Sequence, residues 1–386
     1  MMSRLLHQIR VVLRFLTPNT QTRRHVRLLK ESGLFDRGFY ICSNPRLRRL
    51  FRLAPERHYA LFGEPAGLCP NPSFSPRAYL YNNPDLQGGA ARHPFLHYIE
   101  CGQHEARTVL DTGTVAELPL PVIHPPSAHS SPPAPVAVAL HLYYHDMWPE
   151  FATALEQQSF AFDLYVTATG PEAEVAPLRA QVQARFPQAR VWAMPNHGRD
   201  IFPFLHLLSA GLFAPYRAVC KLHSKKSPHR ADGAVWRQNL VAGVLGPPDR
   251  TQARLDAFLN DPQAGIWVAD GQHYHGEDWW GCNRDLTRDI LARAGLDPAT
   301  GPLNFPAGAI YWVKPAVLAQ LASLHLTASD FEPEQALVDG TTAHAVERTL
   351  GYLSRAAQMD IRESHDLDAP HVERSPFERA RISSLD

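Results

Sequence analysis

The sequence has no run of eighteen consecutive apolar residues, so no transmembrane helix is expected. It has only 5 cysteines and none in Cys-x-x-Cys spacing, which argues against a disulfide scaffold and favours a reducing compartment. It has no net charge either, because 38 basic side chains balance 38 acidic ones, and this argues against nucleic acid as the main partner. What remains is a globular protein whose 386 residues allow about two or three domains.

Charge is unevenly distributed at the N-terminus, where residues 1–32 are basic. Arginines and one lysine precede the first acidic residue, Glu31, and apolar residues recur between them at helical spacing. The pattern predicts a basic amphipathic helix that either lies on an anionic membrane surface or packs on its own domain. The expected location is the cytoplasm, with peripheral contact at the inner face of the cytoplasmic membrane left open.

Residues 33–110 contain an internal repeat with a period of 39 residues. The recurring residues are Phe35, Tyr40, Asn44, His58-Tyr59 and Gly63 in the first unit and Phe74, Tyr79, Asn83, His97-Tyr98 and Gly102 in the second. Each unit predicts a short helix ending at Asn-Pro, a second helix through His-Tyr and a glycine stop. Units this small cannot bury an apolar face alone, so we expect the two to stack, with the His-Tyr pairs in the packing seam.

A proline-rich stretch separates these repeats from the rest of the chain. Residues 111–135 are rich in proline, serine and alanine, which predicts a semi-extended linker and a domain boundary. The main domain is expected to span residues 136–365, followed by a charged tail at 366–386.

Strand and helix patterns alternate through the main domain. The expected strands are 136–144, 163–167, 191–194, 216–220, 265–269 and 309–313, and the expected helices are 148–157, 172–185, 201–210, 315–324 and 334–355, the last helical at least from residue 342. Asp200 is expected to cap the helix 201–210. Such alternation is typical of an α/β fold with a mainly parallel, doubly wound sheet.

Polar residues gather at the ends of two of these strands. Asn196, Gly198, Arg199 and Asp200 follow the third strand, and Lys221, His223, Lys225 and Lys226 follow the fourth. Ligands in open α/β sheets bind at the carboxyl ends of strands. Crowded cations repel one another, and the guanidinium of an arginine matches phosphate, so the pattern favours a phosphate or diphosphate ligand. Taken separately, each stretch is also typical of a turn with a local ion pair or of a solvated basic face.

The ordered motifs of the main domain resemble the rhamnan synthesis protein F family. The motifs are His141-Leu142-Tyr143-Tyr144, Asp163-Leu164-Tyr165-Val166-Thr167, Asn196-x-Gly198-Arg199-Asp200-Ile201-x-Pro203-Phe204, Lys221-x-His223-x-Lys225-Lys226-Ser227, Trp236-Arg237, Phe305-Pro306-Ala307-Gly308, Tyr311-Trp312 and Asp339-Gly340-Thr341-x-x-His344-Ala345-x-Glu347-Arg348. The repeats are similar to small helical repeats that precede glycosyltransferase domains in bacterial polysaccharide enzymes. The resemblance implies a GT-A-like glycosyltransferase of surface polysaccharide, associated with rhamnose from a nucleotide donor.

The chain departs from the usual GT-A pattern at the place where Asp-x-Asp normally holds a divalent metal. Here the sequence reads Lys221-Leu222-His223-Ser224-Lys225-Lys226. Cationic side chains would then stabilise the leaving diphosphate, which predicts activity without a bound metal or other cofactor. Two alternatives stay open: the lysines hold an acceptor phosphate, or the site is degenerate.

The resemblance assigns roles to individual residues. The donor residues would be Tyr143, Tyr144, Thr167, Asn196, Gly198, Arg199, Asp200, Lys221, His223, Lys225 and Lys226. The catalytic base would be Asp339 or Glu334, with Glu347-Arg348 as an ion pair. The sugar and acceptor residues would be Trp279, Trp280, Phe305, Gly308 and His344. His141 and His145 are interpreted as local structure.

Three functions compete on these features. The first is a glycosyltransferase with a nucleotide sugar and a glycan or lipid-linked acceptor as partners. The second is a non-catalytic module that binds glycan or a lipid-linked precursor for a larger assembly. The third is a metal hydrolase built on His273 and His275 with Glu277 or Asp278, which ranks lower because no third ligand stands at a defined spacing.

Overall fold

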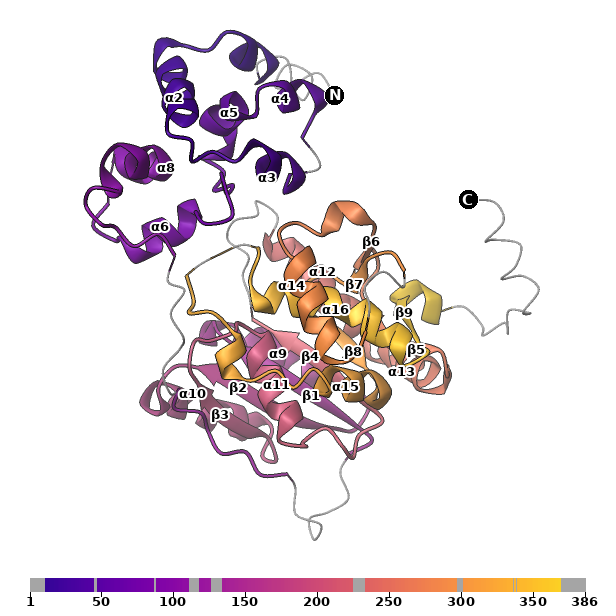
Figure 1. The fold of residues 1–386 in the computed structure, drawn as a ribbon. Coiled ribbons are helices and arrows are strands. Elements are labelled where there is room, and N and C mark those ends of the chain that lie inside the picture. Colours follow the sequence, from indigo (N-terminus) through magenta and orange to yellow (C-terminus); the bar gives the residue numbers. More distant parts are fainter. Residues whose placement is uncertain are drawn as a thin grey trace, which may run out of the picture. The chain divides into compact units, whose positions relative to one another are not determined.

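The structure is a computed structural model that describes residues 11–44, 47–86, 88–110, 118–125, 134–224, 233–296, 301–335, 337 and 339–368. The chain divides into two compact units, which are described separately here (Figure 1). The N-terminal unit contains the described residues up to 110, residues 280–285 and the described residues between 332 and 341. The C-terminal unit contains the remaining described residues. Within the described part of the chain, no helix combines the length and hydropathy needed to cross a bilayer.

The N-terminal unit is helical throughout its repeats. Helix α2 (Thr20–Glu31) precedes the first repeat, which contains α3 (Arg37–Cys42), α4 (Arg49–Leu53), α5 (Pro55–His58) and the π-helix η1 (Tyr59–Gly63). The second repeat contains α6 (Pro76–Asn82), α7 (Gly89–Arg92), α8 (Pro94–His97) and the π-helix η2 (Tyr98–Gly102).

The same hydrogen bond recurs in the two repeats. Tyr40 Oη lies 2.9 Å from His58 Nδ1, and Tyr79 Oη lies 2.9 Å from His97 Nδ1. Burial lowers the pKa of His58 to about 4, so this imidazole is neutral in the folded protein. The histidines of the two His-Tyr pairs therefore serve packing within each repeat.

The repeated glycine makes room for the repeated tyrosine. A Cβ atom on Gly63 would lie 2.2 Å from Tyr40 Oη, and one on Gly102 would lie 2.2 Å from Tyr79 Oη. No side chain fits at that distance, so the hydroxyl packs directly over the glycine backbone. This close approach explains why glycine occupies the same place in both units.

A seven-stranded sheet forms the centre of the C-terminal unit (Figure 1). Its order is β3 (Arg190–Met194), β2 (Phe162–Thr169), β1 (Val136–Leu142), β4 (Ala218–His223), β8 (Tyr311–Val313), β5 (Ala264–Val268) and β9 (Asp360–Glu363). β8 runs antiparallel to both of its neighbours, and every other pairing is parallel. The predicted α/β class with a mainly parallel sheet and an N-terminal helical region is confirmed.

Helices cover both faces of this sheet. Side chains from α9 (Trp148–Glu156), α10 (Glu172–Arg185), α12 (Gly233–Val244) and α13 (Pro248–Asn260) share one apolar core with alternate residues of β1 and β2. Since successive strand residues point to opposite faces, Tyr165 of β2 faces away from this core, and it contacts Phe213, which stacks on Phe204 of α11 (Ile201–Ser209). Helices α15 (Pro315–Ala322) and α16 (Thr342–Ala356) contact α11 and complete the second layer.

Two smaller features complete the C-terminal unit. β6 (His273–His275) pairs antiparallel with β7 (Asn304–Pro306), and α14 (Arg284–Arg293) begins nearby in sequence. Helix α16 begins at Thr342, the later of the two expected starts, because Gly340 has a φ of 75°, outside the helical range.

Candidate functional site

Two turns with unusual backbone geometry lie in the C-terminal unit. Gly198 and Arg199, between β3 and α11, both have a φ of 59°. Gly308 and Ala309, between β7 and β8, have φ values of 88° and 53°. A left-handed conformation in a residue other than glycine costs about 1–3 kcal/mol and persists only where the surroundings hold it. The candidate site therefore consists of these two turns and the side chains that contact them.

A buried ion pair connects the two turns. Lys221 on β4 is 1% exposed, and its Nζ donates to Asp200 Oδ2 at 2.6 Å and to the Ala309 carbonyl at 3.0 Å. Asp200 precedes α11 but makes no side-chain capping bond, because its carboxylate points to the lysine instead. The expected N-terminal cap of α11 is thus replaced by the ion pair between Asp200 and Lys221. Two of the three donors of Lys221 are used inside the protein.

Further bonds fix the second turn from both sides. His223 Nε2 lies 2.8 Å from the Gly308 carbonyl and 4.0 Å from Asp200 Oδ2. On the opposite side, Glu347 of α16 accepts a hydrogen bond from the Gly308 amide at 3.0 Å. Glu347 also forms the predicted ion pair with Arg348, at 2.8 Å. The turn is therefore held between β4 and α16.

The first turn is tied to α16 through its arginine. Arg199 Nη1 lies 3.1 Å from His344 Nε2, so two of the residues nominated from the sequence meet. Gly198 cannot carry a side chain, because a Cβ atom would lie 2.3 Å from Phe202 Cβ. Arg199 as a whole is only partly buried.

His141 completes a polar row across the carboxyl ends of three strands. In the parallel register, His141 of β1 stands beside Thr167 of β2 and His223 of β4. Its Nδ1 lies 3.0 Å from Thr167 Oγ1 and its Nε2 lies 3.3 Å from Thr169 Oγ1. Burial lowers the pKa of His141 to about 3, so the ring is neutral. From the sequence His141 is interpreted as local structure, although a polar residue inside an apolar strand is a signal for a site.

The buried imidazole of His141 predicts an acid-sensitive fold. Below about pH 6.5 the unfolded chain binds a proton on this ring, whereas the folded protein does so only near pH 3. The contribution of this ring to stability is therefore fully present above about pH 6.5 and is lost by about 1.4 kcal/mol per pH unit below it. His58 acts in the same direction down to about pH 4. Urea unfolding at pH 7, 6 and 5 measures this slope.

A variant tests whether His141 causes this pH dependence of the free energy of unfolding. His141→Asn retains an amide near Thr167 and should show a shallower dependence of stability on pH. His124 is exposed in the same unit, so His124→Asn is the control and should keep the full slope. An unchanged slope in His141→Asn would mean that this ring is already protonated in the folded protein at pH 5.

The nominated nucleoside residues lie around this row. Tyr143, directly after β1, is 47% exposed, and its ring meets that of Tyr144 edge to face at 4.8 Å. Tyr144 also donates its backbone amide to Ser224 Oγ at 2.8 Å. Thr167 is buried on His141, whereas Asn196 is exposed. Lys225 and Lys226 lie outside the described residues.

The nominated sugar residues differ in accessibility. Trp279 is partly exposed, and its ring centroid lies 4.0 Å from that of Tyr274 of β6 at an interplanar angle of 40°. Phe305 is 2% exposed, and the guanidinium of Arg348 lies 4.7 Å from its ring centroid. Trp280 groups with the N-terminal unit and is 7% exposed. Among these three aromatic rings, that of Trp279 offers the most surface to a ligand.

The two nominated bases group with the N-terminal unit. Asp339 accepts hydrogen bonds from Asn283 Nδ2 at 2.6 Å and from the Cys282 amide at 3.0 Å. Glu334 lies in the same segment and is partly exposed. Both oxygens of Asp339 therefore have partners within that unit.

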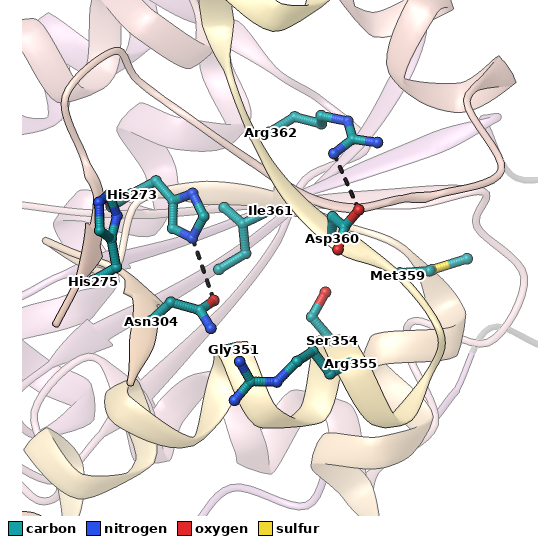
Figure 2. A pocket seen from close by; sticks show the side chains of 10 residues that line it. All are labelled: His273, His275, Asn304, Gly351, Ser354, Arg355, Met359, Asp360, Ile361 and Arg362. Carbon is teal, nitrogen blue, oxygen red and sulfur yellow. Dashed lines mark hydrogen bonds and ion pairs between the residues drawn. The ribbon is translucent and has the colours of Figure 1, made fainter. Parts of the chain in front are cut away.

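A pocket lies elsewhere in the C-terminal unit (Figure 2). Its volume is about 340 Å³, and its lining residues are His273, His275, Asn304, Gly351, Ser354, Arg355, Met359, Asp360, Ile361 and Arg362. His273 Nε2 lies 3.3 Å from Asn304 Oδ1, and burial lowers the pKa of His273. Among the described residues, the groups that bring three ligand atoms within 4.8 Å include neither His273 nor His275. The described residues therefore add no support to the hydrolase hypothesis.

Comparison with known proteins confirms the resemblance noted from the motifs. The sequence model of the rhamnan synthesis protein F family matches residues 108–359. Uncharacterized protein WxcX of Xanthomonas campestris pv. campestris (strain ATCC 33913) is 37% identical over 215 residues, which cover 55% of this chain and 30% of that protein. WxcX of strain B100 is 36% identical over 215 residues, with the same shares covered. The chain thus matches less than a third of the length of these curated relatives.

Proposed function

The chain belongs to the rhamnan synthesis protein F family, and from this premise we propose that it is a glycosyltransferase. It would move a sugar, rhamnose or a similar one, from a nucleotide-diphosphate donor to a growing cell-surface polysaccharide or lipid-linked glycan. The family is implicated in polysaccharide synthesis, and the transfer reaction is the specific step that we assign to this chain.

One observation carries the proposal: polar groups converge at the carboxyl ends of β1, β2 and β4. Two strained turns, at Gly198–Arg199 and Gly308–Ala309, are held there by a buried ion pair and by α16. Ligands of open α/β sheets bind at this edge, and strain of this kind gathers at functional sites. Tyr143 would stack on the nucleobase with its exposed ring.

The charges at this edge favour a diphosphate held without a metal. Asp200 is engaged by the Lys221 ammonium at 2.6 Å, so this carboxylate is neutralised inside the protein. Arg199 is the partly exposed cation of the cluster, and its forked donors match phosphate oxygens. Charge that develops on the leaving diphosphate would be stabilised by Arg199 and by the lysines at 225 and 226. Asp339 and Glu334 stay the proposed bases.

Calorimetric titration with dTDP, UDP and GDP, each with and without Mg²⁺, tests the donor site. We expect one nucleotide to bind without metal. Arg199→Ala should weaken that binding about ten- to hundredfold, as expected for the loss of a charged hydrogen bond, and Lys225→Ala/Lys226→Ala should weaken it as well. Arg185, exposed on α10 and paired with Glu156, provides the control, and Arg185→Ala should bind like the wild type.

The other outcomes each contradict part of the proposal. Binding that requires Mg²⁺ would mean that the diphosphate is held by carboxylates elsewhere. Equal binding by wild type and Arg199→Ala would remove the strand-end cluster from the donor site. No binding of any nucleotide would favour the alternative, a non-catalytic module that binds glycan or a lipid-linked precursor.

A further inference from the structure

A second cluster of titratable side chains lies in the N-terminal unit. The proposed glycosyl transfer assigns no role to these residues. Glu64 is 2% exposed and directly follows the π-helix η1, at the place that Gln103 occupies in the second repeat. His25 of α2 is 4% exposed, and His93, directly before α8, is partly exposed. The two imidazole rings meet edge to face at 5.3 Å.

Glu64 is held in a fixed orientation by one of its oxygens. Its Oε1 accepts the amides of Phe95 and Leu96, at 2.7 Å and 3.1 Å, in the first turn of α8. Its Oε2 is thereby directed at the two histidines, 3.2 Å from His25 Nε2 and 3.1 Å from His93 Nδ1. Fixing a ligand through its other atom is how protein metal sites orient carboxylates.

His25 supplies a second independent observation. Its Nε2 is buried and makes no hydrogen bond, and Glu64 Oε2 lies 3.2 Å away as an ion-pair partner. A buried nitrogen without a hydrogen bond is costly, and a metal ion would satisfy it. The nitrogen points to the same place as the carboxylate oxygen.

The distances match those of a tetrahedral metal centre. Bonds of about 2.0–2.2 Å to zinc place neighbouring tetrahedral ligand atoms about 3.3 Å apart. The observed separations of 3.2 Å and 3.1 Å fall within a few tenths of an ångström of that value, and all three ligand atoms lie within 4.8 Å of one another. Only small side-chain shifts would be needed.

The three ligand atoms also match a metal centre in kind. Two imidazoles and one carboxylate form a ligand set that suits zinc.

We propose that His25 Nε2, His93 Nδ1 and Glu64 Oε2 bind one divalent zinc ion. The fourth position would be reached past the partly exposed ring of His93 and taken by water. The ion would cross-link α2, the first repeat and the second repeat, because each of the three supplies one ligand. Its role would be to stabilise the repeat unit.

The test uses the full-length, tag-free chain, stripped with a chelator and titrated with Zn²⁺ and with Co²⁺. We expect one ion per chain at this site and a tetrahedral Co²⁺ spectrum without sulfur-to-cobalt charge transfer. His93→Ala and Glu64→Gln should each lower the affinity by at least about a hundredfold, more than the loss typical of outer-shell partners. Zinc should raise the Tm of the wild type but not of His93→Ala.

Two control variants test whether zinc binds at other groups of possible ligands. Partly or fully exposed groups at His97, Cys101 and Glu105 and at Asp270, Glu363 and His365 also bring three ligand atoms within 4.8 Å. Cys101→Ala and His365→Ala should leave the wild-type affinity unchanged.

Three outcomes would overturn the site. They are the absence of zinc binding, equal affinity in His93→Ala, and loss of affinity in either control. Circular dichroism shows whether each variant is folded. Glu64→Gln keeps the side-chain volume and retains an oxygen that can accept the α8 amides. If His93→Ala and Glu64→Gln are both folded and both bind zinc normally, the cluster is an ion pair alone.

Discussion

Replacement of Lys221 by methionine should destabilise the C-terminal unit by about 3–5 kcal/mol, the cost of leaving a buried charge without its partner. The Asp200 side chain is 10% exposed, and the lysine ammonium lies closer to it, at 2.6 Å, than His223 Nε2 does, at 4.0 Å. The Ala309 carbonyl loses a donor in the same substitution. Urea unfolding monitored by tryptophan fluorescence measures the change.

Lys314 provides a matched control for this prediction. It is also buried, at 8% exposed, but its ammonium donates to the neutral Asp261 carbonyl at 2.6 Å. Lys314→Met therefore removes one donor from a carbonyl that also accepts the Ala264 amide at 3.3 Å, and should cost about 1–3 kcal/mol. The double variant Lys221→Met/Asp200→Asn should recover part of the loss. Equal costs at Lys221 and Lys314, with no recovery, would mean that the ion pair does not hold the site.

Replacement of Gly198 by alanine should cost about 2–5 kcal/mol. The backbone at φ 59° accounts for about 1–2 kcal/mol, because a side chain disfavours the left-handed conformation. The remainder is overpacking, since the new Cβ would lie 2.3 Å from Phe202 Cβ and 2.9 Å from Phe331 Cδ1. Displacement of the turn would also move Arg199, so nucleotide binding should weaken together with stability.

Gly211 separates the two contributions. Its φ is 76°, but a Cβ there would meet no atom within 4 Å. Gly211→Ala should therefore cost only the backbone contribution of about 1–2 kcal/mol and leave nucleotide binding unchanged. If Gly198→Ala costs no more than Gly211→Ala, then the turn is not packed against Phe202 and Phe331 as described.

Part of the candidate site followed from strand ends alone. Parallel strands end at one edge of a sheet, so the sequence placed Asp200, Lys221 and His223 near one another without knowledge of the fold. The partners of these residues were not accessible in this way. Gly308 and His344 join the cluster from segments more than eighty residues further along the chain, and only the family resemblance named them.

The sequence leaves the partners of a cation open where two interpretations share the same residues. Lysines beside a histidine predict an anion site, and on that ground the sequence nominates Lys221 for the diphosphate. In the structure its ammonium donates to Asp200 and to the Ala309 carbonyl. Local sequence does not reveal whether a cation faces solvent or a carboxylate, because that depends on which helix follows the neighbouring strand.

By itself the sequence determined the period-39 repeat, the α/β class and the strand ends at which polar groups gather. These are local properties, since hydrophobic periodicity, proline and glycine act over a few residues. The tertiary structure alone decided that β8 enters the sheet antiparallel, that His141 lies buried and neutral beside His223, and that Glu64 faces two histidines. Each of these depends on residues distant in sequence, whose meeting follows from packing of the whole unit and not from any one segment.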